Sequence, residues 1–163
     1  MPTELREEVE ELIYREAYYL DQRDWNEWIG LFTEDVSYWM PAWISADELA
    51  SDPETELALI YCESRQGLED RVFRIETEDS AASNPLPRTC HVIGNVLILD
   101  SEEPIRVSAA WTVHHYQPVK GARVHGGRYE YGLIRVDGRL AIQQKKIIFL
   151  NDGVDVPLDI YNV

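Results

Sequence analysis

The sequence predicts an α+β protein in which helices cover one face of a curved antiparallel sheet, and the two layers together form a cone. Apolar residues recur every three or four positions near the N-terminus, as they do along one face of a helix. Beyond Arg88 the apolar period changes to two, which is typical of half-buried strands. Helices followed by a run of strands indicate an α+β fold, and a curved sheet half-closed by helices leaves a cone-shaped cavity.

Two helices are expected at the start of the chain. The first has an apolar stripe on one face and a solvated face that carries most of its glutamates. The stripe consists of Leu5, Val9, Leu12, Ile13, Ala17 and Leu20. Asp24 and Glu27 have the spacing of a capping box, which predicts the start of a second, shorter helix. The buried stripe expected for this second helix is Trp25, Trp28, Ile29 and Phe32.

Short elements and loops alternate in the middle of the chain. A strand is expected over 36–40, where a proline ends it. The acidic segment 45–56 is predicted to be a loop, and the segment 57–63 fits either a strand or the start of a helix. A third helix is expected within 67–77, and serine, asparagine and proline predict a loop over 80–88.

Four strands are expected in the second half of the chain. Their predicted ranges are 89–99, 105–116, 127–136 and 140–150. Asp137 and Gly138 lie between the last two and are typical of a type I′ hairpin turn, because both turn positions need a positive φ. The glycine-rich segment 120–127, which contains His125, is predicted to be a loop.

Length, charge and cysteine content limit the class of protein. Residues 1–163 fit a single domain, because single cores usually grow to roughly 100–200 residues before they divide. The net charge of −15 argues against binding to nucleic acid or to an anionic membrane, because such a chain repels phosphate groups. Cys62 and Cys90 allow at most one disulfide, and no apolar run resembles a signal peptide or a membrane span. We therefore expect a reduced, cytoplasmic protein.

A cysteine and a histidine stand side by side in the expected strand at 89–99, which raises the possibility of a thiolate beside its base. Neighbouring side chains of a strand point to opposite faces, so Cys90 and His91 cannot pair there. A catalytic dyad needs its partners within hydrogen-bond reach, and Cys90 is predicted to be a small core residue instead. The residues expected on its face are Val92, Val96 and Ile98, whereas Ile93, Leu97 and Leu99 are expected beside His91.

His91 has two interpretations. A histidine among inward-facing aliphatic residues is usually a core polar group whose hydrogen bonds are satisfied. In the other interpretation His91 is a general base inside the cone. Asp35 is the carboxylate that we expect to pair with it, and Tyr14 or Tyr18 on the first helix would add a phenol.

Metal-ligand spacings are missing from the sequence. The histidines show no HxH, HxxxH or HxxE spacing, and His114 and His115 face apart because they are neighbours on an expected strand. Two cysteines are too few for structural zinc, and no Cys-x-His and Cys-x-x-His pair is present for a Rieske cluster. The sequence therefore predicts no cofactor-binding or metal-binding residue in this chain. It supplies one plausible base, His91, but no complete catalytic constellation, so no residue is assigned as catalytic.

Tryptophan is concentrated in one part of the chain, since four of the five tryptophans lie between Trp25 and Trp43. Trp39 and Trp43 flank a proline where the first expected strand ends. Large aromatic residues at such a bend suit either the core or a subunit interface, where tryptophan is enriched. The interface residues that we predict are Trp39, Trp43 and Tyr161.

Four stretches of the chain resemble the small (β) subunit of aromatic ring-hydroxylating dioxygenases, a family with a cystatin-like, nuclear-transport-factor-type cone fold. These stretches are REAYYLDQRDWNEWIGLFTEDVSYWMPAW (15–43), GLEDRVFRIETEDSAA (67–82), PRTCHVIGNV (87–96) and KIIFLNDGVDVPLDIYNV (146–163). Within the family, MPAW (40–43) and LEDRVFRI (68–75) are most similar to subunits that serve benzoate, toluate and anthranilate dioxygenases. The segments 60–67 and 89–96 depart from the benzoate pattern, so a halobenzoate, salicylate or other substituted substrate stays open.

The resemblance implies that this chain is the structural subunit of an NADH-dependent enzyme that converts an aromatic acid to a cis-diol. It also implies that the Rieske [2Fe-2S] cluster, the mononuclear iron and the substrate pocket belong to a separate large (α) subunit, with an α3β3 assembly. The alternative from the residues alone is a stand-alone lyase or isomerase that uses Asp35 and His91 in the cone. The stretch 68–75 and the tail 146–163 favour the subunit.

Overall fold

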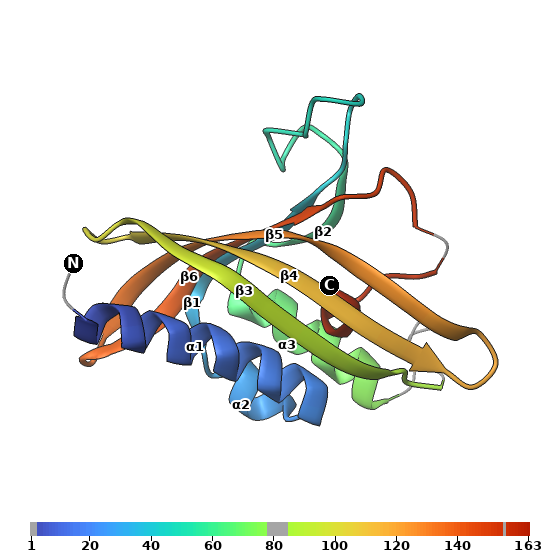
Figure 1. Cartoon of the computed structure of the whole chain (residues 1–163), viewed down its shortest axis with the longest axis horizontal. Helices are drawn as coiled ribbons and strands as arrows, with labels where there is room; N and C mark the ends of the chain where they lie inside the picture. Colours follow the sequence, from blue (N-terminus) through green and yellow to red (C-terminus); the bar gives the residue numbers. More distant parts are fainter. Residues whose placement is uncertain (1–2, 78–84, 155) are drawn as a thin grey trace.

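The computed structural model describes residues 3–77, 85–154 and 156–163. One six-stranded sheet has the order β2-β1-β6-β5-β4-β3, and the α-helices α1, α2 and α3 lie together on one side of it (Figure 1). The predicted α+β architecture is therefore confirmed. The loop expected over 80–88 falls mainly on residues 78–84, which lie outside the described residues.

The first helix follows its predicted pattern. Helix α1 spans Thr3–Gln22, and its apolar stripe is buried except for Leu5, which is partly buried. The stripe also contains Glu16, which is buried with the apolar residues around it. Among the described residues no helix is both long enough and apolar enough to cross a membrane.

The second helix is shorter than predicted. Helix α2 covers Trp25–Ile29, and Asp24 makes no side-chain hydrogen bond at its start, so the predicted capping box is wrong. Phe32 was expected to end this helix, but it begins the first strand. The Phe32 ring packs against the Trp28 ring at 4.8 Å between centroids. This packing buries the same apolar stripe without a longer helix.

The sheet begins with two strands separated by a long loop. Strand β1 spans Phe32–Pro41, and strand β2 spans Ala58–Cys62, so the segment 57–63 is a strand and not a helix start. The intervening segment 42–57 extends away from the side of the sheet that carries the helices (Figure 1). Helix α3 follows at Arg65–Glu76.

The remaining strands form an antiparallel meander, as predicted. They are β3 (Arg88–Asp100), β4 (Ile105–Gln117), β5 (Gly121–Val136) and β6 (Arg139–Phe149). Asp137 and Gly138 have φ values of 50° and 80°, which confirms the hairpin turn between β5 and β6. The sheet is not wholly antiparallel, because β1 pairs in parallel with β6 on its other side. The first and last strands are far apart in sequence, so no hairpin constrains their relative direction.

The glycine-rich segment 120–127 was predicted to be a loop, and this prediction is wrong. Most of it belongs to β5, where His125 pairs with Val113 of β4. Glycine allows the backbones of β5 and β6 to approach each other closely here, since a Cβ atom at Gly127 would overlap the carbonyl oxygen of Ile148 on β6.

A β-bulge in β3 changes which side chains face the core. Asn95 has a φ of 51°, and the pairing with β4 shifts register between Gly94 and Leu97. An extra residue in a strand reverses the alternation beyond it. The inward-facing residues are therefore His91, Ile93, Val96 and Ile98. Cys90 is exposed on the outer face, so its prediction as a core residue is wrong.

Candidate functional site

His91 faces the helices, and both of its ring nitrogens have partners within the fold. Its Nδ1 lies 2.6 Å from the Asp21 carboxylate of α1, and its backbone N–H donates to the same carboxylate at 2.8 Å. Its Nε2 lies 3.3 Å from the carbonyl oxygen of Val163 at the end of the chain. His91 therefore ties strand β3 to helix α1 and to the C-terminal tail.

The predicted pairing of His91 with Asp35 is wrong. Asp35 is exposed on β1, where it accepts a hydrogen bond of 3.0 Å from the Gln143 side chain. Tyr14 and Tyr18, the predicted phenols, are exposed on α1. The sequence pattern failed because the bulged end of β1 turns Asp35 to the surface, while Asp21 of α1 lies opposite His91.

Asp21 is held as an ionised acceptor. It accepts hydrogen bonds from the Thr89 hydroxyl at 2.9 Å and from the backbone and ring of His91. Burial alone would raise the pKa of Asp21, but the hydrogen bonds and charge of His91, together with Thr89, lower it below its ordinary value of 3.8. The carboxylate thus clamps α1 to β3.

Because the pKa of Asp21 is lowered by folding, its contribution to stability is expected to depend on pH in the acid range. The contribution is complete above the unfolded pKa of 3.8 and is lost as the pH falls through the lower folded value. We expect Asp21→Asn to lower the free energy of unfolding by about 1–3 kcal/mol at pH 5. The difference from the unmodified protein should shrink between pH 4 and pH 2, as measured by urea unfolding.

Asp24→Asn is the matched control for this experiment. It makes the same change in charge three residues further along the chain, at a side chain that forms no capping bond. A loss of stability at Asp21→Asn that stayed constant down to pH 2 would contradict the assignment of Asp21 as an ionised clamp.

A buried ion pair lies in the interior of the cone. The Lys145 ammonium is 2.6 Å from the Glu16 carboxylate, and the two side chains are only 1% and 2% exposed. The Tyr131 hydroxyl donates to the other oxygen of Glu16 at 2.8 Å. Lys145 also lies 4.1 Å from the centre of the Tyr129 ring and 5.5 Å from that of Tyr38. The pair is thus enclosed by aromatic rings.

Burial governs the ionisation of this cluster. Burial lowers the pKa of Lys145, and the nearby charge and hydrogen bond of Glu16 oppose that change. Burial first, and the charge of Glu16 second, raises the pKa of Tyr38, Tyr129 and Tyr131 well above 10. The three phenols therefore stay protonated, and the carboxylate and the ammonium are partners of each other.

The C-terminal tail, residues 156–163, packs into the open side of the cone. It ends in a short 3₁₀ helix, η2 (Ile160–Asn162), which Asp159 caps by accepting from the Ile160 N–H at 2.8 Å. Arg71 of α3 lies 3.4 Å from Asp159, and His125 of β5 lies 3.1 Å from the carbonyl oxygen of Asn162. The last four residues, Ile160, Tyr161, Asn162 and Val163, are all buried. The cone is therefore occupied by the chain itself.

The chain's cysteines and histidines do not fit an iron–sulfur cluster or another metal. Cys62 is buried, whereas Cys90 lies exposed on the outer face of the sheet and its neighbour His91 points to the inner face. Within the described ranges no three His, Cys, Asp or Glu side chains gather in a group that could hold a metal ion. We therefore assign no chemical step to a metal held by this chain.

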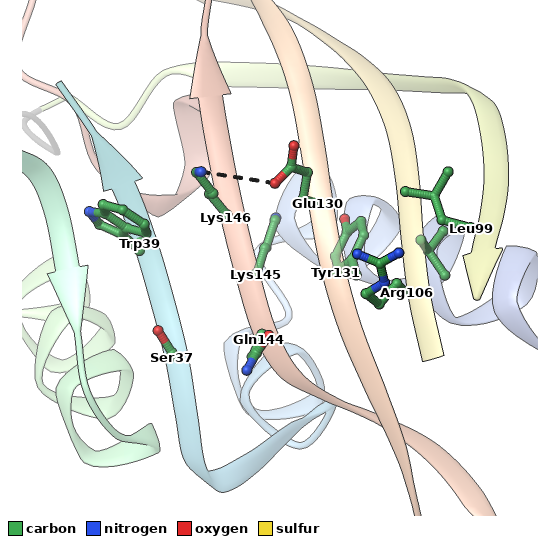
Figure 2. Close-up of a pocket in the computed structure, with 10 residues that line it drawn as sticks. Ser37, Trp39, Leu99, Arg106, Glu130, Tyr131, Gln144, Lys145 and Lys146 are labelled. Atoms are coloured by element: carbon green, nitrogen blue, oxygen red, sulfur yellow. Dashed lines mark ion pairs between the residues drawn. The ribbon is translucent and has the colours of Figure 1, made fainter. Parts of the chain in front are cut away.

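A hollow of about 340 Å³ lies on the outer face of the sheet, where neighbouring strands contribute side chains (Figure 2). Trp39 of β1 is paired in register with Lys146 of β6, which in turn faces Glu130 of β5. The Lys146 ammonium lies 5.1 Å from the Trp39 ring centre and 4.0 Å from the Glu130 carboxylate. The remaining lining residues are Ser37, Leu99, Arg106, Val107, Tyr131, Gln144 and Lys145.

The predicted interface residues occupy different places. Trp39 is partly exposed at this hollow, and Trp43 donates its indole N–H to the carbonyl oxygen of Phe149 at 2.6 Å. Tyr161 is only 2% exposed and lies in the tail that fills the cone. The two tryptophans therefore have different surroundings in the fold. The role of all three residues at an interface stays a prediction.

Glu16 and Lys145 were missed by the sequence analysis, although both carry a usable signal. Glu16 falls on the helical stripe between Ile13 and Leu20, where an acidic residue must be buried. Lys145 shares its strand face with Ile147 and so points inward. A charged residue on a buried face needs an opposite charge, so the two positions predict each other.

These features define an α+β cone protein whose interior is closed by its own paired charges and its own tail. Comparison with known proteins gives the family. The chain belongs to the ring hydroxylating beta subunit family, whose model matches residues 15–155.

Two relatives match almost the whole chain. The small subunit of 2-halobenzoate 1,2-dioxygenase from Burkholderia cepacia is 41% identical over 152 residues, covering 93% of this chain and 92% of the relative. The small subunit of anthranilate 1,2-dioxygenase from Acinetobacter baylyi is 38% identical and covers 100% of both chains. The crystal structure of the beta subunit of benzoate 1,2-dioxygenase from Burkholderia mallei is 32% identical, with a TM-score of 0.77 and 95% of each chain covered.

Proposed function

We propose that this chain is the structural small subunit of a multicomponent, NADH-dependent dioxygenase that converts an aromatic acid to a cis-diol. In this proposal residues 1–163 act as a single cytoplasmic domain, the partner is the large (α) subunit, and the assembly is α3β3. The observation that carries the proposal is similarity over nearly the full length to dioxygenase small subunits. Neither nucleic acid nor membrane is a partner, in keeping with the net charge of −15.

The filled cone supports a structural role over the alternative of a lyase or isomerase. A cone enzyme needs a general base within reach of a substrate, and a substrate needs space beside that base. Here His91 is held between Asp21 and the chain terminus, and the tail lies against it. Asp35 stands at the surface and cannot assist it.

The cofactors in this proposal belong to the large subunit. They are a Rieske [2Fe-2S] cluster and a mononuclear iron, which transfer electrons and activate oxygen. The small subunit supplies neither ligand set, since its cysteines lie in different environments, His91 and His125 are used in internal contacts, and His114 and His115 face apart on β4. Its contribution is to hold the large subunits in the assembly.

The relatives also suggest a substrate class. 2-Halobenzoate, anthranilate and benzoate share an aromatic ring with a carboxylate, and these are the compounds in the names of the matched enzymes. We propose an aromatic acid of this kind as the substrate of the complex.

We expect the complex of this chain with its large subunit to oxidise 2-halobenzoate, benzoate or anthranilate with kcat/KM at least about 100-fold above that for biphenyl. A site that pairs a carboxylate rejects an analogue without one strongly, because its polar groups are left unpaired. Oxygen uptake measures the reaction with each acid, and cis-diol formation measures it with benzoate. Methyl benzoate is the matched control, since it keeps the ring and loses the charge. Equal rates with biphenyl and with the acids would contradict the proposed substrate class.

A further inference from the structure

We propose that the hollow on the outer face of the sheet is the docking site for an acidic segment of the large subunit, with Arg106 as the residue that binds its carboxylate. This inference rests on the proposed function, which supplies the partner. It adds the surface that the partner meets and the chemistry that the surface selects.

The charge of the hollow is opposite to that of the chain. The whole sequence has 30 acidic residues and 15 lysines and arginines. The side chains of Arg106 and Lys146 line the hollow, and Glu130 is the carboxylate that accompanies them. Glu130 is already engaged by Lys146 at 4.0 Å and by Arg128 at 3.7 Å. A cationic patch on an acidic protein favours an acidic partner.

Arg106 is the unused cation of this group. It is exposed on β4, and it makes no hydrogen bond or ion pair to another side chain in the described part of the chain. An arginine guanidinium binds a carboxylate through two parallel hydrogen bonds, which gives both strength and orientation. Arg106 is therefore ready to receive a carboxylate without breaking an internal contact.

Apolar side chains extend the surface beside the hollow. Beyond the bulge in β3, Leu97 and Leu99 face outward and are 56% and 52% exposed, and Val92, before the bulge, also faces outward and is 55% exposed. Leu99 also lines the hollow, opposite the Trp39 ring (Figure 2). A tryptophan, an arginine and exposed aliphatic residues on one face are typical of the core of a protein interface. Val92 and Leu97 lie outside the hollow, so a protein segment can contact them together with the hollow, whereas a free aromatic acid held in the hollow cannot.

The test measures assembly of the enzyme from its two subunits. The chain and its large subunit are expressed separately, and their dissociation constant is measured by titration calorimetry. We expect Arg106→Glu to weaken assembly by at least about 100-fold, because it places a carboxylate against the partner's carboxylate. We expect Trp39→Ala to weaken assembly by at least about 30-fold, which is the loss typical of an interface hot spot.

Arg74→Glu is the matched control. It makes the same charge change at an exposed position of α3, on the helix side of the sheet. We expect the control to change the dissociation constant by less than about 3-fold, as is usual for residues outside an interface. Thermal unfolding of each isolated variant shows whether the fold is intact, and we expect Arg106→Glu to leave it intact because the side chain is exposed.

The outcomes separate this inference from the proposed function. Failure of the unmodified chain to bind the large subunit contradicts the proposed function itself. Normal binding by a folded Arg106→Glu variant overturns only the docking site. Two further results also overturn it: Arg106-dependent self-association of the chain, which assigns the face to a second copy, or Arg106-dependent binding of millimolar benzoate with normal assembly.

Discussion

Replacing Glu16 by leucine is expected to lower the free energy of unfolding by about 3–5 kcal/mol, the usual cost of breaking a buried ion pair from one side. The substitution leaves the Lys145 ammonium in the interior with aromatic rings around it and no carboxylate. The Tyr131 hydroxyl loses its acceptor at the same time. Urea unfolding at pH 7 measures the loss.

The double variant Glu16→Leu, Lys145→Met is expected to recover most of this loss. Two apolar side chains of similar volume remove both buried charges together, and such replacements are often neutral or stabilising. The comparison separates the cost of an unpaired charge from the cost of altered packing. A double variant as unstable as the single one would contradict the assignment of a compensated pair.

A pH series gives a second measure of the same effect. Removing Glu16 removes the interactions that raise the pKa of Lys145, so burial lowers that pKa further. The unfolded chain then binds more protons than the folded one up to the ordinary lysine value of 10.5. The single variant should therefore regain stability, relative to the double variant, as the pH rises from 7 toward 10.

Glu11→Leu on the same helix is the control for the substitution itself. Glu11 is 63% exposed and pairs with Arg15 one turn away. Exposed ion pairs contribute little to stability. The control should change the unfolding midpoint far less than Glu16→Leu does, and the same change in both variants would show that burial is not the cause.

The helices and the meander could be predicted from local periodicity. The stripe of α1 and the alternation along β4 need no information beyond the chain's own apolar pattern. The turn at Asp137 and Gly138 is also local, because two positive φ angles require those residue types. These predictions succeeded because one segment contains all the information for them.

The features that failed depend on contacts between distant segments. The parallel pairing of β1 with β6 joins residues about a hundred positions apart, and no hairpin turn in the sequence indicates it. Simple alternation puts Cys90 on the same face as Val96 and Ile98. The bulge at Asn95 turns Val96 and Ile98 to the inner face and leaves Cys90 on the outer face, so the prediction of Cys90 as a core residue is wrong. Alternation alone cannot locate an inserted residue.

The site was predicted in part. The sequence places His91 correctly on the inner face, but it predicts Asp35 as the partner, whereas the structure pairs His91 with Asp21. Whether the cone is open or filled depends on where the C-terminal tail packs, and the tail has little regular structure beyond η2. The family resemblance succeeded where spacing did not, because it draws on the whole chain.

The second large effect concerns catalysis. The isolated chain is expected to turn over no aromatic acid, while the complex with the large subunit does. His91→Ala should weaken folding or assembly, because it breaks the contacts from β3 to Asp21 and Val163. Activity should then fall in proportion to the amount of complex. A general base removed from an active site would instead cost about 10²–10⁴-fold at constant assembly.

Turnover per mole of assembled complex, with the metals that we propose for the large subunit fully loaded, tests the structural role most directly. The measurement compares the isolated chain, the unmodified complex and the complex containing His91→Ala. We predict no turnover by the isolated chain and the same turnover per complex for both assemblies. A reaction catalysed by the small chain alone, or a fully assembled His91→Ala complex slowed by 100-fold or more, would contradict the account.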